Sequence, residues 1–232
     1  MLYSSLKNLR YIYKDRVIIA SQMLEFGIKS FPIVAIIGIF TGAVSAWQAE
    51  YQFRGLIPIK YVAPATAKAI FIELGPVLTA LIIAGRNGAS IAAELGTMKV
   101  TEQIDALETL AIDPVRFLST PRIIAGFTMM PALVIFADFI AIMGAFIVLN
   151  VFLSIDYMTF INGVKEYFRI WEFLGGVIKA FVFGGTTALV GVYIGFSTHG
   201  GAEGVGRATI RAFVISSVLI LINDYLLATI MF

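Results

Sequence analysis

Long apolar runs without charge constrain this chain more than any other feature. Residues 30–49 contain no charged side chain, and residues 123–155 contain only Asp138. About twenty apolar residues in a helix are enough to cross the hydrocarbon core of a bilayer. The second run is long for one upright crossing and short for two, so we expect one tilted helix plus an interfacial segment. Five spans are predicted, with six as the alternative: 30–49, 62–85, 122–149, 173–198 and 208–232.

The composition supports the same class of protein. Charged residues make up 14% of the chain, against about 25% in soluble domains. So few charged residues cannot form the polar surface of a soluble domain, and they do not fit the composition of a disordered chain. The absence of cysteine excludes a disulfide scaffold. The apolar residues run continuously instead of alternating, which disfavours a β-barrel. We therefore expect an all-α integral membrane protein with a single domain over residues 1–232.

The amino-terminal segment, residues 1–29, predicts an amphipathic helix. Five apolar residues from Leu2 to Val17 recur on one helical stripe, and cationic residues lie along its flank. An apolar face with flanking cations suits a helix that lies in the membrane interface. A cytoplasmic helix packed on the same protein is the alternative.

The distribution of Lys and Arg predicts the orientation. Eleven of the seventeen lie on the side of the membrane that holds the N-terminus and the segments 86–122 and 199–211. Cytoplasmic loops carry an excess of Lys and Arg. This predicts a cytoplasmic N-terminus and a C-terminus on the opposite side.

The residues offer little support for catalysis. His199 is the only histidine, and it falls in a glycine-rich segment at a predicted membrane boundary. No cluster of His or Cys suggests a metal site, and the phosphate-binding string GxxxxGK[ST] does not occur. We expect no catalytic residue, no metal ligand and no cofactor on this chain.

Three acidic residues, Glu73, Asp138 and Asp224, fall within predicted spans. A carboxylate there costs several kcal/mol unless it is paired, protonated or in contact with water. Each is therefore either a lining group of a polar cavity or a member of a buried pair, for which Lys68 and Lys179 are candidates.

Glu73 differs from the other two acids because Gly75 and Pro76 follow it closely. A proline removes one helical hydrogen bond and clashes with the carbonyl four residues earlier, here that of Ile72. The helix should kink or loosen beside the acid. A broken membrane helix next to a carboxylate is typical of ligand sites.

The polar segment 86–122 predicts a helix of its own over residues 92–110. An apolar stripe at helical spacing runs from Val100 to Ala111, and acidic residues occupy other faces. Such a helix either docks a soluble partner or rests on its own protein. Thr120-Pro121 predicts an N-cap and first-turn proline at the start of the next span.

Glycines recur at positions where helices could pack closely. The pairs at 38 and 42 and at 191 and 195 have the spacing of small-residue packing motifs, within one chain or between two. The glycines of residues 199–206 predict a tight turn between two helices.

Residues 73–126 closely resemble the MlaE (YrbE) family of ABC-transporter permeases. The matching strings are ELGP at 73–76, AGRNGA at 84–89, AAELGTMKVTEQIDAL at 92–107 and DP at 113–114. Residues 206–232 look like the family's C-terminal helix, and the span pattern also fits.

The resemblance implies a homodimer whose subunits have an N-terminal interfacial helix and five transmembrane helices. It implies cytoplasmic ABC ATPase subunits that bind ATP and Mg, a periplasmic MCE-domain protein and, in some systems, a STAS-domain protein. It also implies a location in the inner membrane, with the C-terminus periplasmic, and transport of phospholipids or related lipids between that membrane and the outer envelope.

The resemblance also suggests site residues. Those implied for coupling to the ATPase are Glu94, Lys99, Glu102, Gln103 and Asp105; those for lipid binding are Phe40, Val44, Trp47, Gln48, Glu73 and Leu74. Two other functions remain open from the residues alone. One is an ion-coupled carrier that uses the three intramembrane acids, and the other is a lipid enzyme that uses His199.

Overall fold

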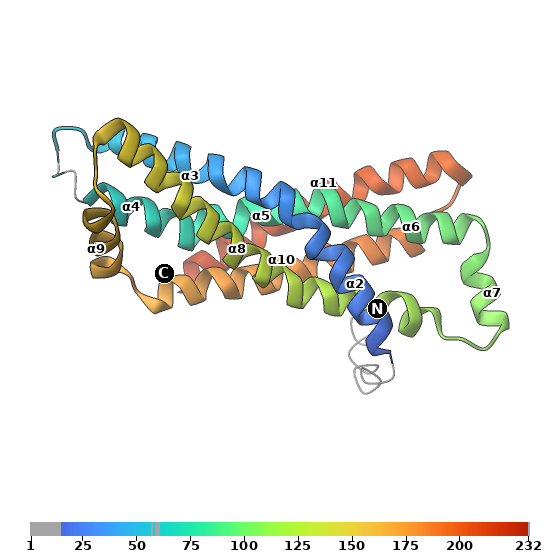
Figure 1. Cartoon of the computed structure of the whole chain (residues 1–232). Helices are drawn as coiled ribbons and strands as arrows, with labels where there is room; N and C mark the ends of the chain where they lie inside the picture. The colour runs from blue at the N-terminus through green and yellow to red at the C-terminus, as the bar shows by residue number, and fades with distance from the viewer. Residues whose placement is uncertain (1–14, 57, 59–60, 232) are drawn as a thin grey trace. The chain divides into compact units, whose positions relative to one another are not determined.

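A computed structural model describes residues 15–56, 58 and 61–231. All regular secondary structure in these residues is helical, and Figure 1 shows the elements in chain order. This confirms the predicted all-α class. Most of the apolar stripe predicted for the amino-terminal helix lies outside the described residues.

Five helices in the described residues are long and apolar enough to cross a membrane. Each coincides with one predicted span; the first three extend well beyond it, and the fourth ends two residues before its predicted end at 198. The extra length arises because each helix continues into the polar residues that flank its apolar run. A prediction based on apolar runs alone leaves these residues out. The five helices are Arg16–Phe53, Val62–Val100, Val115–Leu153, Ile170–Phe196 and Gly201–Met231.

Several of these long helices are composite. The first consists of α2 (Arg16–Phe26), a 3-10 turn (η2, Ile28–Ser30) and α3 (Phe31–Phe53). The third consists of a π-turn (η6, Val115–Ser119) and α8 (Thr120–Leu153).

The second long helix contains two π-turns. Its elements in order are α4 (Val62–Ala69), η4 (Ile70–Leu74), α5 (Gly75–Ile83), η5 (Ala84–Gly88) and α6 (Ala89–Val100).

The remaining elements are two short helices, α7 (Gln103–Thr109) and α9 (Tyr157–Tyr167), and two long ones, α10 (Ile170–Phe196) and α11 (Gly201–Met231). Asp156 caps α9, because its carboxylate accepts hydrogen bonds from the Thr159 amide and hydroxyl. These bonds lower the pKa of Asp156. The cap therefore stabilises α9 above the pKa of the unfolded chain and is lost as the pH falls through the folded value.

The chain divides into two compact units. Unit 1 comprises residues 1–30, 80–131 and 180–232, and unit 2 comprises residues 31–79 and 132–179. The prediction of a single domain is not decided by this division and stays a prediction.

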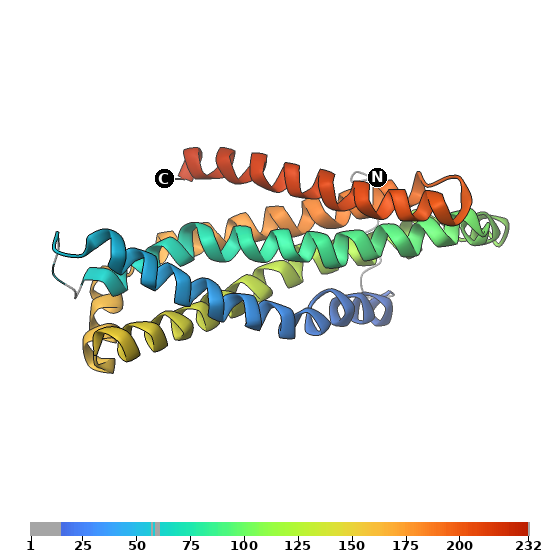
Figure 2. The same ribbon diagram turned by 90° about the horizontal axis from the view of Figure 1, so that it is seen from above.

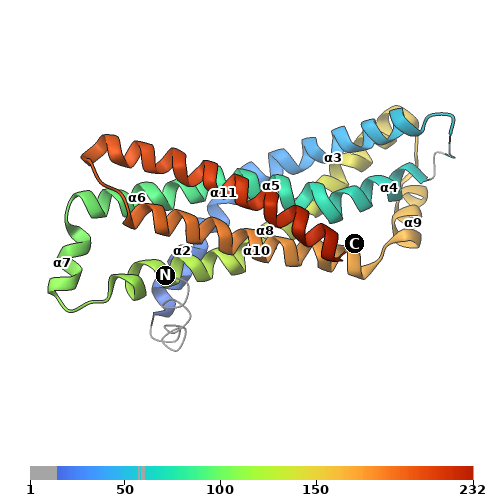
Figure 3. The ribbon, with the colours of Figure 1, turned by 180° about the vertical axis from the view of Figure 1, so that it is seen from behind.

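In unit 1, α11 packs along α6 (Figures 1 and 3). Their contact buries Ala92 of α6 and Ala208 and Ala212 of α11, together with Ile194 of α10. Gly195 permits the close approach of α10, since a Cβ there would lie 2.6 Å from Cβ of Leu95. The glycine motif of α10 therefore serves packing within the chain.

In unit 2, α3 packs against the second half of α8, and Figure 2 shows the two side by side. Any side chain at Gly42 would overlap the backbone of Ala141, and one at Gly38 would lie 3.1 Å from the Ala137 carbonyl oxygen. This glycine motif also packs within the chain. A cluster of buried apolar residues joins α3, α4, α8 and α9 and includes the fully buried Phe160.

The helix loosens beside Glu73, as the sequence predicts. The π-turn η4 directly precedes Gly75 and Pro76, and the Gly75 amide donates to the carbonyl of Ile70, five residues earlier. The wider turn accommodates a proline that an α-helical turn would not.

Two predicted boundaries are wrong. The helix predicted over 92–110 is not continuous: residues 92–100 end the second long helix, Glu102 has a φ of 61°, and α7 follows. Thr120 is not an N-cap, because the helix starts earlier, at Pro114, where the Asp113 carboxylate accepts from the Val115 amide. The π-turn η6 carries the chain past Pro121 without a break.

The third predicted span is also longer than expected. Helix α8 continues without interruption to Leu153 and contains Pro131, so the apolar run is one helix and not a helix plus an interfacial segment. The turn predicted for the glycine-rich segment is confirmed at Gly200 and Gly201, whose φ angles are 90° and 64°. Gly204 and Gly206 lie inside α11.

Candidate functional site

Four of the five residues predicted to couple to an ATPase lie at the junction of α6 and α7, in unit 1. Lys99 Nζ lies 2.8 Å from Asp105 Oδ1, so this ion pair bridges the break between the two helices. Gln103 donates to the Thr101 hydroxyl at 3.0 Å. Glu102 is exposed at the break, and its backbone carbonyl accepts from the Ala106 amide. The junction is thus a defined polar turn and not a loose linker.

Apolar side chains at the end of α7 were missed by the sequence analysis. Leu110 is 69% exposed and Ile112 is 38% exposed, whereas Ile104, on the predicted stripe, is buried. Ile104 lies within α7, whereas Leu110 and Ile112 follow the end of that helix. A signal existed, since Leu110 and Ile112 are apolar residues between acidic ones.

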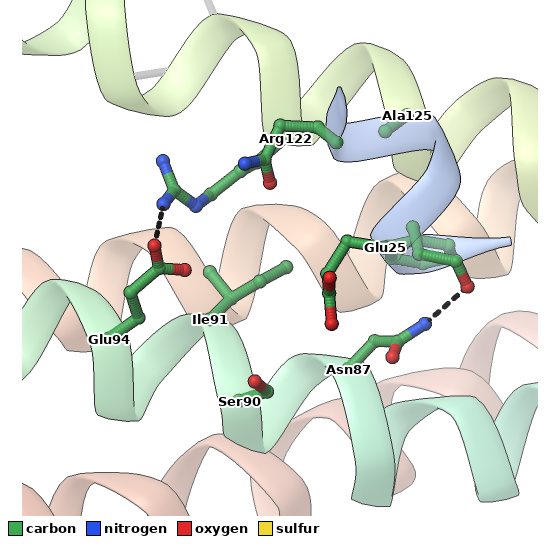
Figure 4. A pocket seen from close by; sticks show the side chains of 9 residues that line it. Glu25, Asn87, Ser90, Ile91, Glu94, Arg122 and Ala125 are labelled. Atoms are coloured by element: carbon green, nitrogen blue, oxygen red, sulfur yellow. Dashed lines mark hydrogen bonds and ion pairs between the residues drawn. The ribbon is translucent and has the colours of Figure 1, made fainter. Parts of the chain in front are cut away.

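Glu94 lies apart from this turn, on α6. Its carboxylate pairs with Arg122 of α8 at 2.8 Å, as Figure 4 shows. The Arg122 side chain is 5% exposed and that of Glu94 is 55% exposed. Glu94 therefore holds a buried cation of its own chain, and its role in coupling stays a prediction. The pair borders a small pocket lined by residues of α2, η5, α6 and α8.

The same pocket borders a hydrogen-bonded anchor at the break between α2 and α3. Asn87 Nδ2 donates to the Phe26 carbonyl at 2.7 Å and to the Ser30 hydroxyl at 3.2 Å (Figure 4 shows the first bond). Arg86 donates to the Ser30 hydroxyl and to Asn87 Oδ1. The π-turn η5 places these two consecutive polar residues where they satisfy the end of α2.

Unit 2 contains a groove between α3 and α4–η4, which we call the α3–α4 groove. It collects three of the residues predicted to bind lipid, namely Val44, Gln48 and Leu74. Its walls combine apolar and polar side chains. The full lining is Val44, Ser45, Gln48, Ala49, Gln52, Phe53, Ala65, Thr66, Ala69 and Leu74.

The other predicted lipid residues lie outside this lining. Phe40 is 66% exposed on α3, and Trp47 packs edge-on against Phe152, with ring centroids 5.2 Å apart. Glu73 is the neighbour of Leu74 in η4 but does not line the groove. The structure thus brings together half of the predicted set.

Glu73 forms an interhelical ion pair. Its Oε2 lies 2.7 Å from Nζ of Lys179 on α10, and the lysine side chain is fully buried while that of Glu73 is 44% exposed. Lys68, the other candidate partner, pairs with Glu172 at 2.8 Å. Glu73 is therefore a member of an interhelical pair, which is the second of the two alternatives, and its side chain is partly exposed.

The two other intramembrane acids are buried, with Asp138 2% and Asp224 8% exposed. A Cβ at Gly75 would overlap the Asp138 carboxylate, so the glycine leaves room for the acid beside η4. His199 is exposed near the start of α11. No group of three potential metal ligands occurs in the part of the chain that the structure describes.

Comparison with known proteins identifies the family. The family described as permease MlaE matches residues 19–230. A probable ABC transporter permease protein of Rickettsia typhi is 42% identical over 215 residues, which cover 93% of this chain and 83% of that protein.

More distant relatives include named proteins. The intermembrane phospholipid transport system permease protein MlaE of Haemophilus influenzae is 33% identical over 234 residues, covering 100% of this chain and 89% of that protein. The chloroplastic protein TRIGALACTOSYLDIACYLGLYCEROL 1 of Arabidopsis thaliana is 33% identical over 211 residues, covering 91% of this chain and 60% of that protein. With long apolar helices and a matching profile over most of its length, the chain belongs to the MlaE family of ABC transporter permeases.

Proposed function

We propose that this chain is the membrane subunit of an ATP-driven transporter that moves phospholipids or related lipids between the inner membrane and the outer envelope. The observation that carries the proposal is the similarity over the whole chain to a Haemophilus protein named for intermembrane phospholipid transport. ATP hydrolysis takes place on a separate cytoplasmic ATPase, which binds ATP and Mg, and this chain supplies no catalytic group.

The α3–α4 groove is the lipid site of this proposal. Val44, Ala69 and Leu74 provide apolar wall for an acyl chain, and Gln48 and Gln52 provide amide groups for polar atoms of the lipid. Phe40 and Trp47 extend the apolar surface of α3 beside the groove. Glu73 adds a carboxylate in the same π-turn as Leu74.

The α6–α7 turn is the coupling site of this proposal. An exposed polar turn held by an ion pair presents Glu102, Gln103 and Asp105 to a soluble partner, while Leu110 offers an apolar contact. Movement of this turn is transmitted to the second long helix, because α6 is the last element of that helix. An ATPase that pulls on α7 would therefore act on a membrane-spanning segment.

The proposal includes the partners that the family implies. The chain forms a homodimer that binds cytoplasmic ABC ATPase subunits and a periplasmic MCE-domain protein. A STAS-domain protein, which some systems of the family contain, is a further partner. The complex lies in the inner membrane with the N-terminus of this chain in the cytoplasm and its C-terminus in the periplasm.

Reconstitution tests the proposal. The permease and its ATPase are placed in proteoliposomes, and transfer of a fluorescent phospholipid to acceptor vesicles is followed with and without ATP. We expect ATP-dependent transfer that Leu74→Arg reduces about tenfold, because burying a guanidinium in the groove costs more than 1.4 kcal/mol. Met158→Arg, at an exposed position of α9 outside the five long helices, controls for added charge.

Two outcomes would overturn the proposal. Transfer that ignores ATP but stops when an ion gradient is dissipated would identify an ion-coupled carrier that uses Glu73, Asp138 and Asp224. Equal transfer by Leu74→Arg and the unmodified protein would remove the α3–α4 groove from the lipid path.

A further inference from the structure

A second cavity lies in unit 1, where α10 ends and α11 begins (Figure 3), and we call it the α10–α11 cavity. It is formed by the last two turns of α10, the turn at Gly200 and the first turns of α11. Its lining is Tyr193, Ile194, Ser197, Thr198, His199, Gly204, Arg207, Ala208 and Arg211. None of these residues lines the α3–α4 groove.

The cavity is cationic. Arg207 and Arg211 are four residues apart on α11 and therefore lie on one face, and both line the cavity. No carboxylate is among the lining residues. Glu203 pairs with Arg207 at 2.8 Å from one turn earlier, where both side chains are mostly exposed. Arg211 is exposed and forms no ion pair within the described part of the chain.

Two hydroxyl groups of the cavity already donate hydrogen bonds within the chain. Ser197 donates to the Tyr193 carbonyl at 2.9 Å, and Thr198 donates to the Ile194 carbonyl at 3.0 Å. The Tyr193 hydroxyl and the His199 imidazole also line the cavity, so a ligand there could receive hydrogen bonds from these two groups and from the two charged guanidinium groups. Guanidinium groups bind phosphate through paired, charge-assisted hydrogen bonds, so the expected ligand is an anion of this type.

The cavity borders exposed apolar surface on α10 and α11. Ile210, Phe213 and Val214 of α11 are 66%, 41% and 49% exposed, and Tyr193 of α10 is 63% exposed. Cationic side chains next to exposed apolar ones at a span's end are typical of the level at which lipid headgroups lie. The Lys and Arg distribution predicts that this end is cytoplasmic.

We propose that the α10–α11 cavity binds the phosphate group of an anionic phospholipid headgroup. The guanidinium groups of Arg207 and Arg211 hold the phosphate, and the acyl chains lie along the apolar surface of α11. Basic pockets between transmembrane helices bind anionic headgroups in this way. The α10–α11 cavity and the α3–α4 groove are different sites, and this proposal does not depend on the function proposed for the groove.

Native mass spectrometry of the full chain in detergent tests the site. Phosphatidylglycerol is titrated against the unmodified protein and against the double variant Arg207→Gln/Arg211→Gln. Each cation near a membrane surface contributes about 1 kcal/mol of attraction, so we expect the double variant to bind roughly 30-fold more weakly. Lys165→Gln/Arg169→Gln removes two exposed cations elsewhere and should bind as the unmodified protein does.

Two further variants make the test specific. Glu203→Gln releases Arg207 from its carboxylate partner and should strengthen phosphatidylglycerol binding about five-fold. Glu166→Gln removes an exposed carboxylate elsewhere, on α9, and should leave this affinity unchanged. A melting temperature within a few degrees of the unmodified protein shows that a variant is folded.

Several results would overturn the proposal. The headgroup assignment is wrong if the double variant binds phosphatidylglycerol as tightly as its matched control does. Glycerol phosphate that competes at the lipid's own concentration would identify a site for free phosphate esters instead. Unchanged lipid affinity together with lost ATPase binding would assign the two arginines to partner docking.

Discussion

Single polar residues decide how this largely apolar chain is held together. Asn87 is 6% exposed and satisfies the Phe26 carbonyl at the point where α2 ends. A helix end that is buried without such a partner leaves backbone groups unpaired. The side chains of Asn87 and Ser30 together satisfy the carbonyl at the point where α2 ends.

Replacing Asn87 tests this anchor. Asn87→Ala removes the hydrogen bonds of Asn87 to Phe26, Ser30 and Arg86, each with a net value of about 0.5–1.5 kcal/mol, while the Ser30 hydroxyl still donates to the Phe26 carbonyl. We expect a clear fall in the melting temperature of the detergent-solubilised protein. Asn162→Ala, at an exposed position of α9, should leave the melting temperature unchanged. Equal melting temperatures for the two variants would show that the Asn87 bonds do not stabilise the fold.

The ion pairs of the chain should differ in value according to burial. Glu73→Gln removes a carboxylate from the fully buried Lys179, and losing one partner of a buried pair costs about 3–5 kcal/mol. Glu25→Gln removes the partner of Lys29 on an exposed surface, where a pair contributes about 0–1 kcal/mol. In thermal unfolding, the melting temperature of Glu73→Gln should therefore be well below that of Glu25→Gln. The reverse order would show that the Glu73 pair is not needed for stability.

At the scale of elements, the sequence predicts where the apolar helices lie but not where they end. Residues such as Glu94 and Lys99 are charged and still helical, because α6 is stabilised by packing against α11 and not by apolar composition. Thr120-Pro121 has the pattern of a helix start, yet a π-turn lets the helix pass the proline. Tertiary contacts and turn geometry of this kind leave no signal in a single sequence.

The candidate sites were predictable to different extents. Val44, Gln48 and Leu74 came from the family resemblance and meet in one groove. Leu110 was missed because its exposure depends on where α7 ends. Arg207 and Arg211 were missed because their common cavity requires the turn at Gly200 to bring α10 beside α11.

Some glycines of this chain permit close helix packing and others do not, and one of each kind should respond oppositely to replacement by alanine. Gly42→Ala places a methyl group against the Ala141 backbone and should lower the melting temperature. Gly206 lies within α11 with open space around its Cα, so Gly206→Ala should stabilise the helix by about 0.5–1 kcal/mol. The same substitution thus separates close packing from helix propensity. Equal effects of both would contradict the packing described for Gly42.

At the scale of the whole molecule, the polar turn should be the attachment point for the ATPase. Glu102→Lys/Asp105→Lys reverses two exposed charges, and Asp105 also loses its pair with Lys99. We expect binding to the ATPase to weaken roughly tenfold, or 1.4 kcal/mol, in a pull-down titration. Asn162→Lys/Glu166→Lys adds positive charge at exposed positions of α9 and should leave ATPase binding unchanged. Retained ATPase binding and stimulated hydrolysis in the first variant would exclude the turn as the docking site.

The π-turn before Pro76 has a consequence for comparing sequences of this family. A π-turn adds one residue to a helix, and each added residue rotates the rest of that helix by about 100°. Positions on either side of Ile70–Leu74 that share a 3.6-residue period in the sequence therefore point in different directions. A relative that lacks one residue in this turn would present a different set of side chains to Lys179, even if its sequence were identical at all other positions. Insertions and deletions here should accordingly change function more than most substitutions do.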